Sequence, residues 1–212
     1  MKDINYYEAA DRAIQAMNRD TVREFGRLKT AKFDELNIIQ QVNTLYRRQT
    51  RKAKQRYFEV GFEGYILGLY LCGFDNRKAH RMAEKAITPK WVDEFLRAAD
   101  PVTLYAFYPE AERKAARLAE SLSVTNEPIA EIEKAMRYWS KQTGQYAIDV
   151  TDEAVKLAYS DAGIEEVMWV TARDERVCEE CGPMDGQVFP IDRIPPKPHW
   201  GCRCMLYPVR KT

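Results

Sequence analysis

The sequence predicts a mainly α-helical protein, with a multi-helix N-terminal body and a small, turn-rich α+β module at the C-terminus. Three observations support this fold class. Apolar residues recur every three or four positions through most of residues 1–162, which is the period of an amphipathic helix. Glycine and proline become dense after residue 163, and such density excludes long helices. Four of the five cysteines fall in the same C-terminal part.

The composition indicates a globular protein. The chain has 212 residues, of which 45% are hydrophobic, and its net charge is +1, so any attraction to nucleic acid must come from a local cluster of charges. The first residues lack the apolar core of a signal peptide. The most apolar run, residues 65–74, has about half of the ~20 residues that a membrane-spanning helix needs. We therefore expect no membrane contact, and cysteines that are reduced when the protein is made.

The first helices are predicted by apolar periodicity. An apolar stripe runs from Ile4 to Met17. A second helix should begin near residues 30–34 and end at about Val60, with one apolar side. Four glycines then interrupt the segment 61–73. Because helix propensity is weak there, we expect a kinked helix or close helix packing, in a buried core segment rather than a membrane-active one.

Capping signals set the later helices. Thr88-Pro89 combines an N-cap residue with proline at the first helical position, and Asp100-Pro101 repeats the pattern. Further helices are expected over 108–122 and over 128–139, the latter extending past Gly144 to about residue 159. Residues 161–163 form a helix stop. Six aromatic residues should be core rather than a base-stacking platform: Trp91, Phe95, Tyr105, Phe107, Tyr138 and Trp139.

The predicted organisation is a helical body, residues 1–162, which is the candidate partner-facing part, and a module, residues 163–212. In the module, residues 164–170, 188–191 and 203–209 have the pattern of short strands between turns.

The module carries the pattern Cys178-x2-Cys181-x17-His199-x2-Cys202-x-Cys204. Two close ligand pairs separated by a loop are how a tetrahedral zinc site is built. Spacing favours Cys178, Cys181, His199 and Cys202, with Cys204 able to replace a member of the second pair. Because four protein ligands leave no open coordination position, the expected zinc is structural. A disulfide cage is the alternative.

The residues that frame the cysteines carry a resemblance. They are Trp169-x-Thr171, Asp174-x-Arg176-x-Cys178-x2-Cys181, Asp185-Gly186 and Pro198-His199-x2-Cys202-Arg203-Cys204. In this order they resemble the C-terminal signature of the phage minor head, or head morphogenesis, proteins of the Mu F-like family. The resemblance covers about 40 of the 212 residues. One departure is Trp200-Gly201, where relatives often have Pro-Asn; it alters the turn and leaves the ligand types unchanged.

The resemblance implies a virion protein of a tailed phage or prophage, made in the bacterial cytoplasm and located inside the head near the portal. The partners that it implies are the portal protein, other head proteins and packaged double-stranded DNA. It implies a structural role in head morphogenesis and no enzymatic activity.

A local basic cluster is the candidate contact for DNA or for an acidic portal surface. Between Glu35 and Glu59 there is no acidic residue. The same interval holds six cations, which a helix would spread over one side and its flank: Arg47, Arg48, Arg51, Lys52, Lys54 and Arg56. The alternative is a solvated helix face that is paired with acids from elsewhere in the fold.

Two other functions compete with the virion protein. One is a zinc-dependent nuclease or transferase, for which Asp174, Asp185 and Asp192 would be the nearby carboxylates. The module has one histidine and no His-Glu-x-x-His helix, so Asp174 and Asp185 are better explained as turn and cap residues. The other is a cellular zinc-ribbon protein that binds nucleic acid.

Overall fold

The computed structural model describes residues 5–31, 37–98, 106–171 and 179–210. These residues form helices α1 (Glu8–Lys29), α2 (Ile38–Leu71), α3 (Asn76–Ala86), α4 (Pro89–Arg97), α5 (Phe107–Val124) and α6 (Pro128–Asp161). They also form strands β1 (Glu166–Val170), β2 (Val188–Pro190) and β3 (Met205–Val209), and a 3-10 turn, η1 (Gly182–Met184). The mainly helical fold with a small α+β module is confirmed. Ile4 and Asp100-Pro101 lie outside the described residues.

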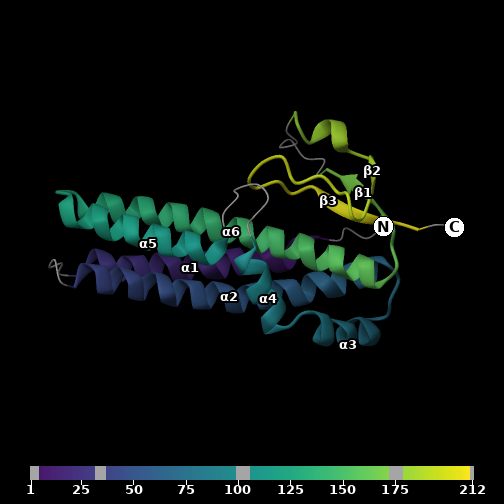
Figure 1. The fold of residues 1–212 in the computed structure, drawn as a ribbon, viewed down its shortest axis with the longest axis horizontal. Helices are drawn as coiled ribbons and strands as arrows, with labels where there is room; N and C mark the ends of the chain where they lie inside the picture. Colours follow the sequence, from purple (N-terminus) through teal and green to yellow (C-terminus); the bar gives the residue numbers. More distant parts are fainter. Residues whose placement is uncertain (1–4, 32–36, 99–105, 172–178, 211–212) are drawn as a thin grey trace.

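Four long helices make the body of the molecule. Helices α1, α2, α5 and α6 run side by side along its long axis (Figure 1). The short helix α3 packs against α2, while the sheet lies on the α6 side of the same end of the bundle (Figure 1). This arrangement places the C-terminal module and α3 at one end of the molecule, on opposite sides.

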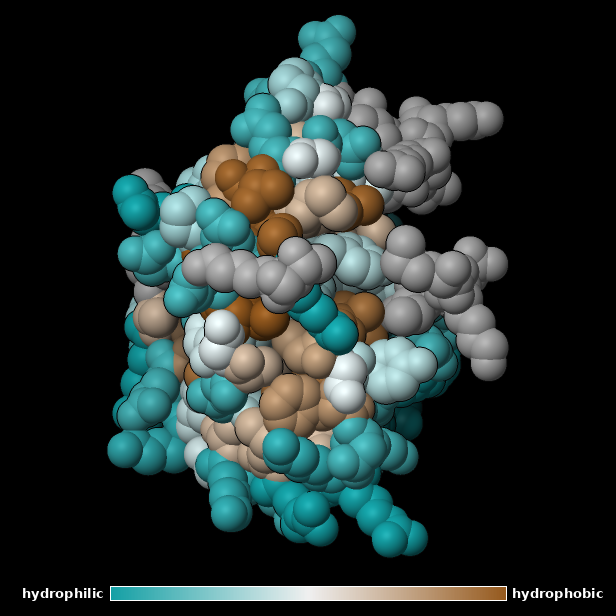
Figure 2. Space-filling model, turned by 90° about the vertical axis from the view of Figure 1, so that its right-hand side faces the viewer, coloured by the Kyte–Doolittle hydropathy of each residue, from teal (hydrophilic) through white to brown (hydrophobic). Residues whose placement is uncertain are grey.

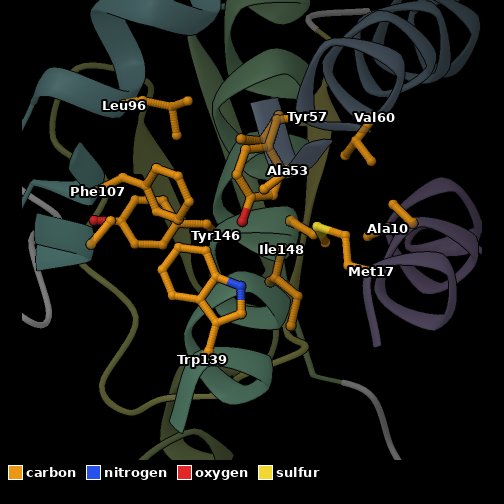
Figure 3. Packing of buried hydrophobic residues seen from close by; sticks show 14 of the residues in the cluster. Ala10, Met17, Ala53, Tyr57, Val60, Leu96, Phe107, Trp139, Tyr146 and Ile148 are labelled. Carbon is orange, nitrogen blue, oxygen red and sulfur yellow. The ribbon is translucent and has the colours of Figure 1, made fainter. Parts of the chain in front are cut away.

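Aromatic residues fill the middle of the bundle (Figure 3). Phe107 is fully buried and lies edge-on to Tyr146 at a centroid distance of 4.9 Å and to Tyr57 at 5.5 Å, a favourable geometry for aromatic pairs. Trp139 is also fully buried against Phe107. The prediction that Tyr138 belongs to the core is wrong. Its side chain is 57% exposed, because it lies on the outward face of α6. Tyr105 lies outside the described residues.

Helix α2 continues through the glycine segment. It begins at Ile38 and ends at Leu71, so the expected end near Val60 is wrong, whereas the expected close packing is confirmed. Glycines at 61, 64 and 68 are buried against α4 and α6. A Cβ atom at Gly68 would lie 2.7 Å from Ala158 Cβ and 3.0 Å from the Val155 carbonyl oxygen. The glycines therefore stay in the helix because packing against α6 outweighs their low propensity. No helix in the described part of the chain is long and apolar enough to cross a membrane.

Two helix termini, the start of α4 and the end of α6, have the capping residues that the sequence indicates. The Thr88 hydroxyl accepts a hydrogen bond from the Trp91 N–H at 3.2 Å, which opens α4. Gly163 has φ +73°, and the following N–H, that of Ile164, donates to the Tyr159 carbonyl at 2.9 Å. This is the Schellman geometry, which favours glycine because it tolerates the left-handed conformation. The chain turns there from α6 into the sheet.

The sheet is small and antiparallel. Its strand order is β2-β1-β3, with Trp169 opposite Leu206 in the register of β1 and β3. Val167, Trp169 and Leu206 are buried and belong to the same apolar cluster as the bundle core. The predicted strands are confirmed, and the described residues of the module form no separate apolar core.

The close contact between α2 and α6 can be tested at Gly68. Replacing it in Gly68→Ala should lower the free energy of unfolding by about 1–3 kcal/mol, because the added methyl group overpacks the contact with Ala158. Gly26→Ala is the matched control, since a Cβ atom there meets nothing within 4 Å; it should stabilise α1 by about 0.5–1 kcal/mol. Urea unfolding of both variants measures this, and equal effects would contradict the packing explanation.

Candidate metal centre

Three of the predicted ligands come together in the structure. Cys181 directly precedes η1, His199 lies in the loop between β2 and β3, and Cys202 lies shortly before β3. One ligand atom from each lies within 4.8 Å of the other two. Both cysteines are buried, at 2% and 1% exposure. Cys178 lies outside the described residues, so the structure leaves its predicted role untested.

Two separations among the three candidate ligand atoms match those expected around a zinc ion. Bonds of about 2.3 Å to sulfur and 2.0 Å to nitrogen place two thiolates about 3.8 Å apart at the corners of a tetrahedron, and a thiolate and an imidazole nitrogen about 3.5 Å apart. Cys181 Sγ lies 3.7 Å from Cys202 Sγ and 3.4 Å from His199 Nε2. The cluster can therefore hold a metal ion with little rearrangement.

The tautomer of His199 also favours binding of a cation. The His199 Nδ1–H donates to the Trp200 carbonyl oxygen at 2.9 Å, because a carbonyl can only accept. Such a bond sets the tautomer in which Nε2 carries the lone pair for a metal. Burial raises the pKa of the Cys202 thiol. A bound cation would offset that cost by stabilising the thiolate.

Cys204 lies next to the cluster and is also buried. Its thiol interacts with that of Cys202, but it is not one of the three described residues whose ligand atoms converge. The sequence left open whether Cys202 or Cys204 completes the set, and among the described residues it is Cys202 whose sulfur lies with the ligand atoms of Cys181 and His199. A fourth ligand could come from Cys178 or Cys204.

One face of α6 carries the module. Gln145, Asp152 and Tyr159 stand seven residues apart, which places them on the same side of a helix. The Gln145 side-chain oxygen accepts from the Gly201 N–H at 2.6 Å. The Tyr159 hydroxyl donates to the Leu206 carbonyl at 2.8 Å. These bonds hold the backbone on either side of Cys202.

Asp152 forms the third anchor through a partly buried ion pair. Its carboxylate lies 2.5 Å from Lys197 Nζ, and the same ammonium group donates to the Cys202 carbonyl at 3.1 Å. The Tyr7 hydroxyl accepts from Lys197 at 2.6 Å and lies 2.8 Å from both Asp152 Oδ1 and the Cys204 carbonyl. Burial raises the pKa of Asp152, and Lys197 opposes that shift. The network ties the N-terminal turn, α6 and the ligand loop together.

A second ion pair joins α1 to the module. Arg203 makes a bidentate pair with Asp11, at 2.9 and 2.8 Å, and its guanidinium lies over the Tyr7 ring. The sequence does not single out these anchors. Gln145 and Asp152 stand at heptad spacing, but polar residues occupy many other positions of α6, so this spacing is a weak signal.

The nearby carboxylates have structural partners. Asp185 Oδ1 accepts from both the backbone N–H and the hydroxyl of Thr171, at 2.8 and 3.1 Å, as expected for a turn residue. Asp192 is exposed and lies beside Arg193. Asp174 lies outside the described residues.

The structure divides the six cations of the basic segment on α2 into two groups. Lys52 contacts Glu24 at 3.1 Å, Lys54 contacts Asp93 at 2.6 Å and Arg56 contacts Glu59 at 2.9 Å. In contrast, Arg47, Arg48 and Arg51 are exposed. Within the described part of the chain, none of these three arginines forms an ion pair. Arg47 and Arg51 line a groove of about 550 Å³ between α2 and α5.

The fold and the site together define a helical protein whose C-terminal Cys/His module packs on α6 and α1. A family model described as phage Mu protein F like protein matches residues 113–207. This range includes most of α5, all of α6 and the Cys/His module, and the match confirms the resemblance to phage head proteins for this part of the chain. The basic segment and α3 lie outside it. No curated protein and no solved structure matches the chain.

The Asp152–Lys197 ion pair should contribute more to the free energy of unfolding than the more exposed Asp11–Arg203 pair. Lys197→Met should lower the free energy of unfolding by about 1–3 kcal/mol, because it leaves a largely buried carboxylate without its charged partner. The double variant Asp152→Leu/Lys197→Met should cost less than the sum of the single variants. Asp11→Asn, in the more exposed pair with Arg203, should cost about 0–1 kcal/mol. Chemical unfolding of the four variants measures the coupling; additive losses at 152 and 197 would contradict it.

Proposed function

We propose that this chain is a minor head protein of a tailed phage, a structural rather than catalytic component that acts in head morphogenesis inside the head and near the portal. The observation that carries the proposal is the family match over residues 113–207, which contains the converging Cys/His ligands. In this proposal residues 163–212 are the metal-held module, and residues 1–162 are the body that faces the portal, other head proteins and DNA.

The proposed metal is one structural zinc ion, held by Cys181, His199 and Cys202 with a fourth thiolate from Cys178 or Cys204. Zinc is supported by the two soft thiolates, the imidazole and their tetrahedral spacing. It would supply the module with stability, because the described residues of the module form no separate apolar core.

Purified protein should contain about one zinc per chain. Cys181→Ser and Cys202→Ser should each lose the metal and lower the thermal stability, and chelation of the wild type should do the same. Cys72→Ser is the control, since Cys72 lies outside the converging cluster and its loss should leave the zinc in place. Elemental analysis and thermal unfolding measure these outcomes. Comparing Cys178→Ser with Cys204→Ser identifies the fourth ligand, and a metal-free wild type with oxidised thiols would favour the disulfide alternative.

The head assignment has its own test. The protein should be found in purified phage particles, and it should co-purify with the portal protein from lysed infected or induced cells. Quantitative mass spectrometry of gradient-purified particles measures this. Absence from the particles would overturn the assignment whatever the metal content, whereas metal-dependent cleavage of nucleic acid would favour the nuclease alternative.

We also propose that Arg47, Arg48 and Arg51 contact packaged DNA or an acidic surface of the portal protein. It is supported by their exposure and by the lack of ion pairs for them among the described residues. Lys52, Lys54 and Arg56 are less suited to this role, because each already has a carboxylate partner. If DNA is the partner, replacing the three arginines by glutamine should make DNA binding less dependent on salt.

A further inference from the structure

Among the described helices, α3 has the highest density of exposed positive charge. Its eleven residues carry four exposed cations and one acid, Glu84. The cations are Arg77, Lys78, Arg81 and Lys85. Figure 2 shows long hydrophilic side chains projecting along the lower edge of this end of the molecule, which is the side on which α3 lies in Figure 1.

Packing explains only one face of α3. Ala79 and Ala83 are buried in a cluster with Tyr65 and Leu69 of α2. The cations stand on the rest of the helix surface, away from these small residues. Packing against α2 therefore explains the position of α3 but not its positive charge.

Unlike half of the α2 cations, the four on α3 have no acidic partner. Among the described residues none of them forms an ion pair; the one charge contact is that of Lys78 over the Phe74 ring, at 4.4 Å. Arg77, Arg81 and Lys85 are each four residues apart, and like charges at this spacing destabilise a helix. An anionic ligand would relieve that repulsion.

We propose that α3 is a binding surface for the phosphate backbone of nucleic acid. Successive cations at spacing four lie about 6 Å apart along the helix axis, which makes a row of positive charge. Two of them are arginines, whose planar guanidinium groups match phosphate oxygens bidentately. The fully exposed positions of α3 are polar or charged, whereas the centre of a protein–protein interface is apolar and poor in charge. These features favour phosphates over an acidic protein partner.

This proposal is independent of the zinc site and of the α2 arginines. Helix α3 lies outside the residues that the family model matches, and it contributes no residue to the Cys/His cluster. It can therefore fail while the head assignment stands.

The test is binding of the full-length protein to a short DNA duplex of random sequence, measured by fluorescence anisotropy over a series of salt concentrations. The α3 variant combines Arg77→Gln, Lys78→Gln, Arg81→Gln and Lys85→Gln. If all four cations contact phosphates, the slope of log affinity against log salt should fall by about 3–4. Between about 50 and 200 mM salt, the affinity of the wild type should then fall roughly 100-fold more than that of the variant.

A charge-matched control replaces four exposed cations that already contact carboxylates: Arg12, Arg23, Lys90 and Lys134. It changes the net charge equally and should leave the slope nearly unchanged. The variant Arg47→Gln/Arg48→Gln/Arg51→Gln separates the two basic surfaces. A loss confined to that variant, or equal losses in the α3 variant and the control, would overturn the proposal for α3.

A measurement on the wild type tests the proposal even if the α3 variant does not fold. Bound duplex should protect Lys78 and Lys85 from acetylation, detected by mass spectrometry, while the exposed Lys90 stays reactive. Lack of protection would count against α3. Competition with polyglutamate tests the other partner class. If polyglutamate displaces the duplex at equal charge concentration, α3 binds acidic polymers generally, and the nucleic-acid assignment is wrong.

Discussion

The close approach of α2 and α6 is the contact on which the rest of the structure depends. Both helices are 34 residues long, and the glycines of α2 let its backbone lie against Ala158 and Val155 of α6. That contact fixes α6 in the centre of the molecule, where it also packs on α1 and α5. A different face of α6, the one with Gln145, Asp152 and Tyr159, then carries the C-terminal module.

The module depends on α6 and α1 for its position. Its apolar residues join the bundle core, and its backbone is bonded to α6 near Gly201, Cys202 and Leu206. Lys197 contacts both Asp152 and the carbonyl of a predicted ligand, Cys202. Metal binding and docking onto the helices are therefore expected to be coupled, because the same short loop takes part in both.

The charged residues show why local patterns are weak evidence for a binding site. The basic run on α2 is conspicuous in sequence, but half of its members neutralise carboxylates on α1, α2 and α4. The cations of α3 are fewer and less conspicuous, yet the fold leaves all four without an acidic partner among the described residues. The ion pairs formed in the tertiary structure therefore determine which cations remain available to a partner.

The sequence by itself determined the fold class, the short strands, the caps at Thr88 and Gly163, and the types of ligand in the C-terminal cluster, because these depend on local spacing and backbone preference. Only the tertiary structure decided that α2 runs on to Leu71, since helix packing there outweighs glycine's low propensity. It also decided that Cys181, His199 and Cys202 converge, and that Asp152 and Tyr7 hold the loop beside them. These contacts join residues far apart in the chain, and no local pattern specifies them.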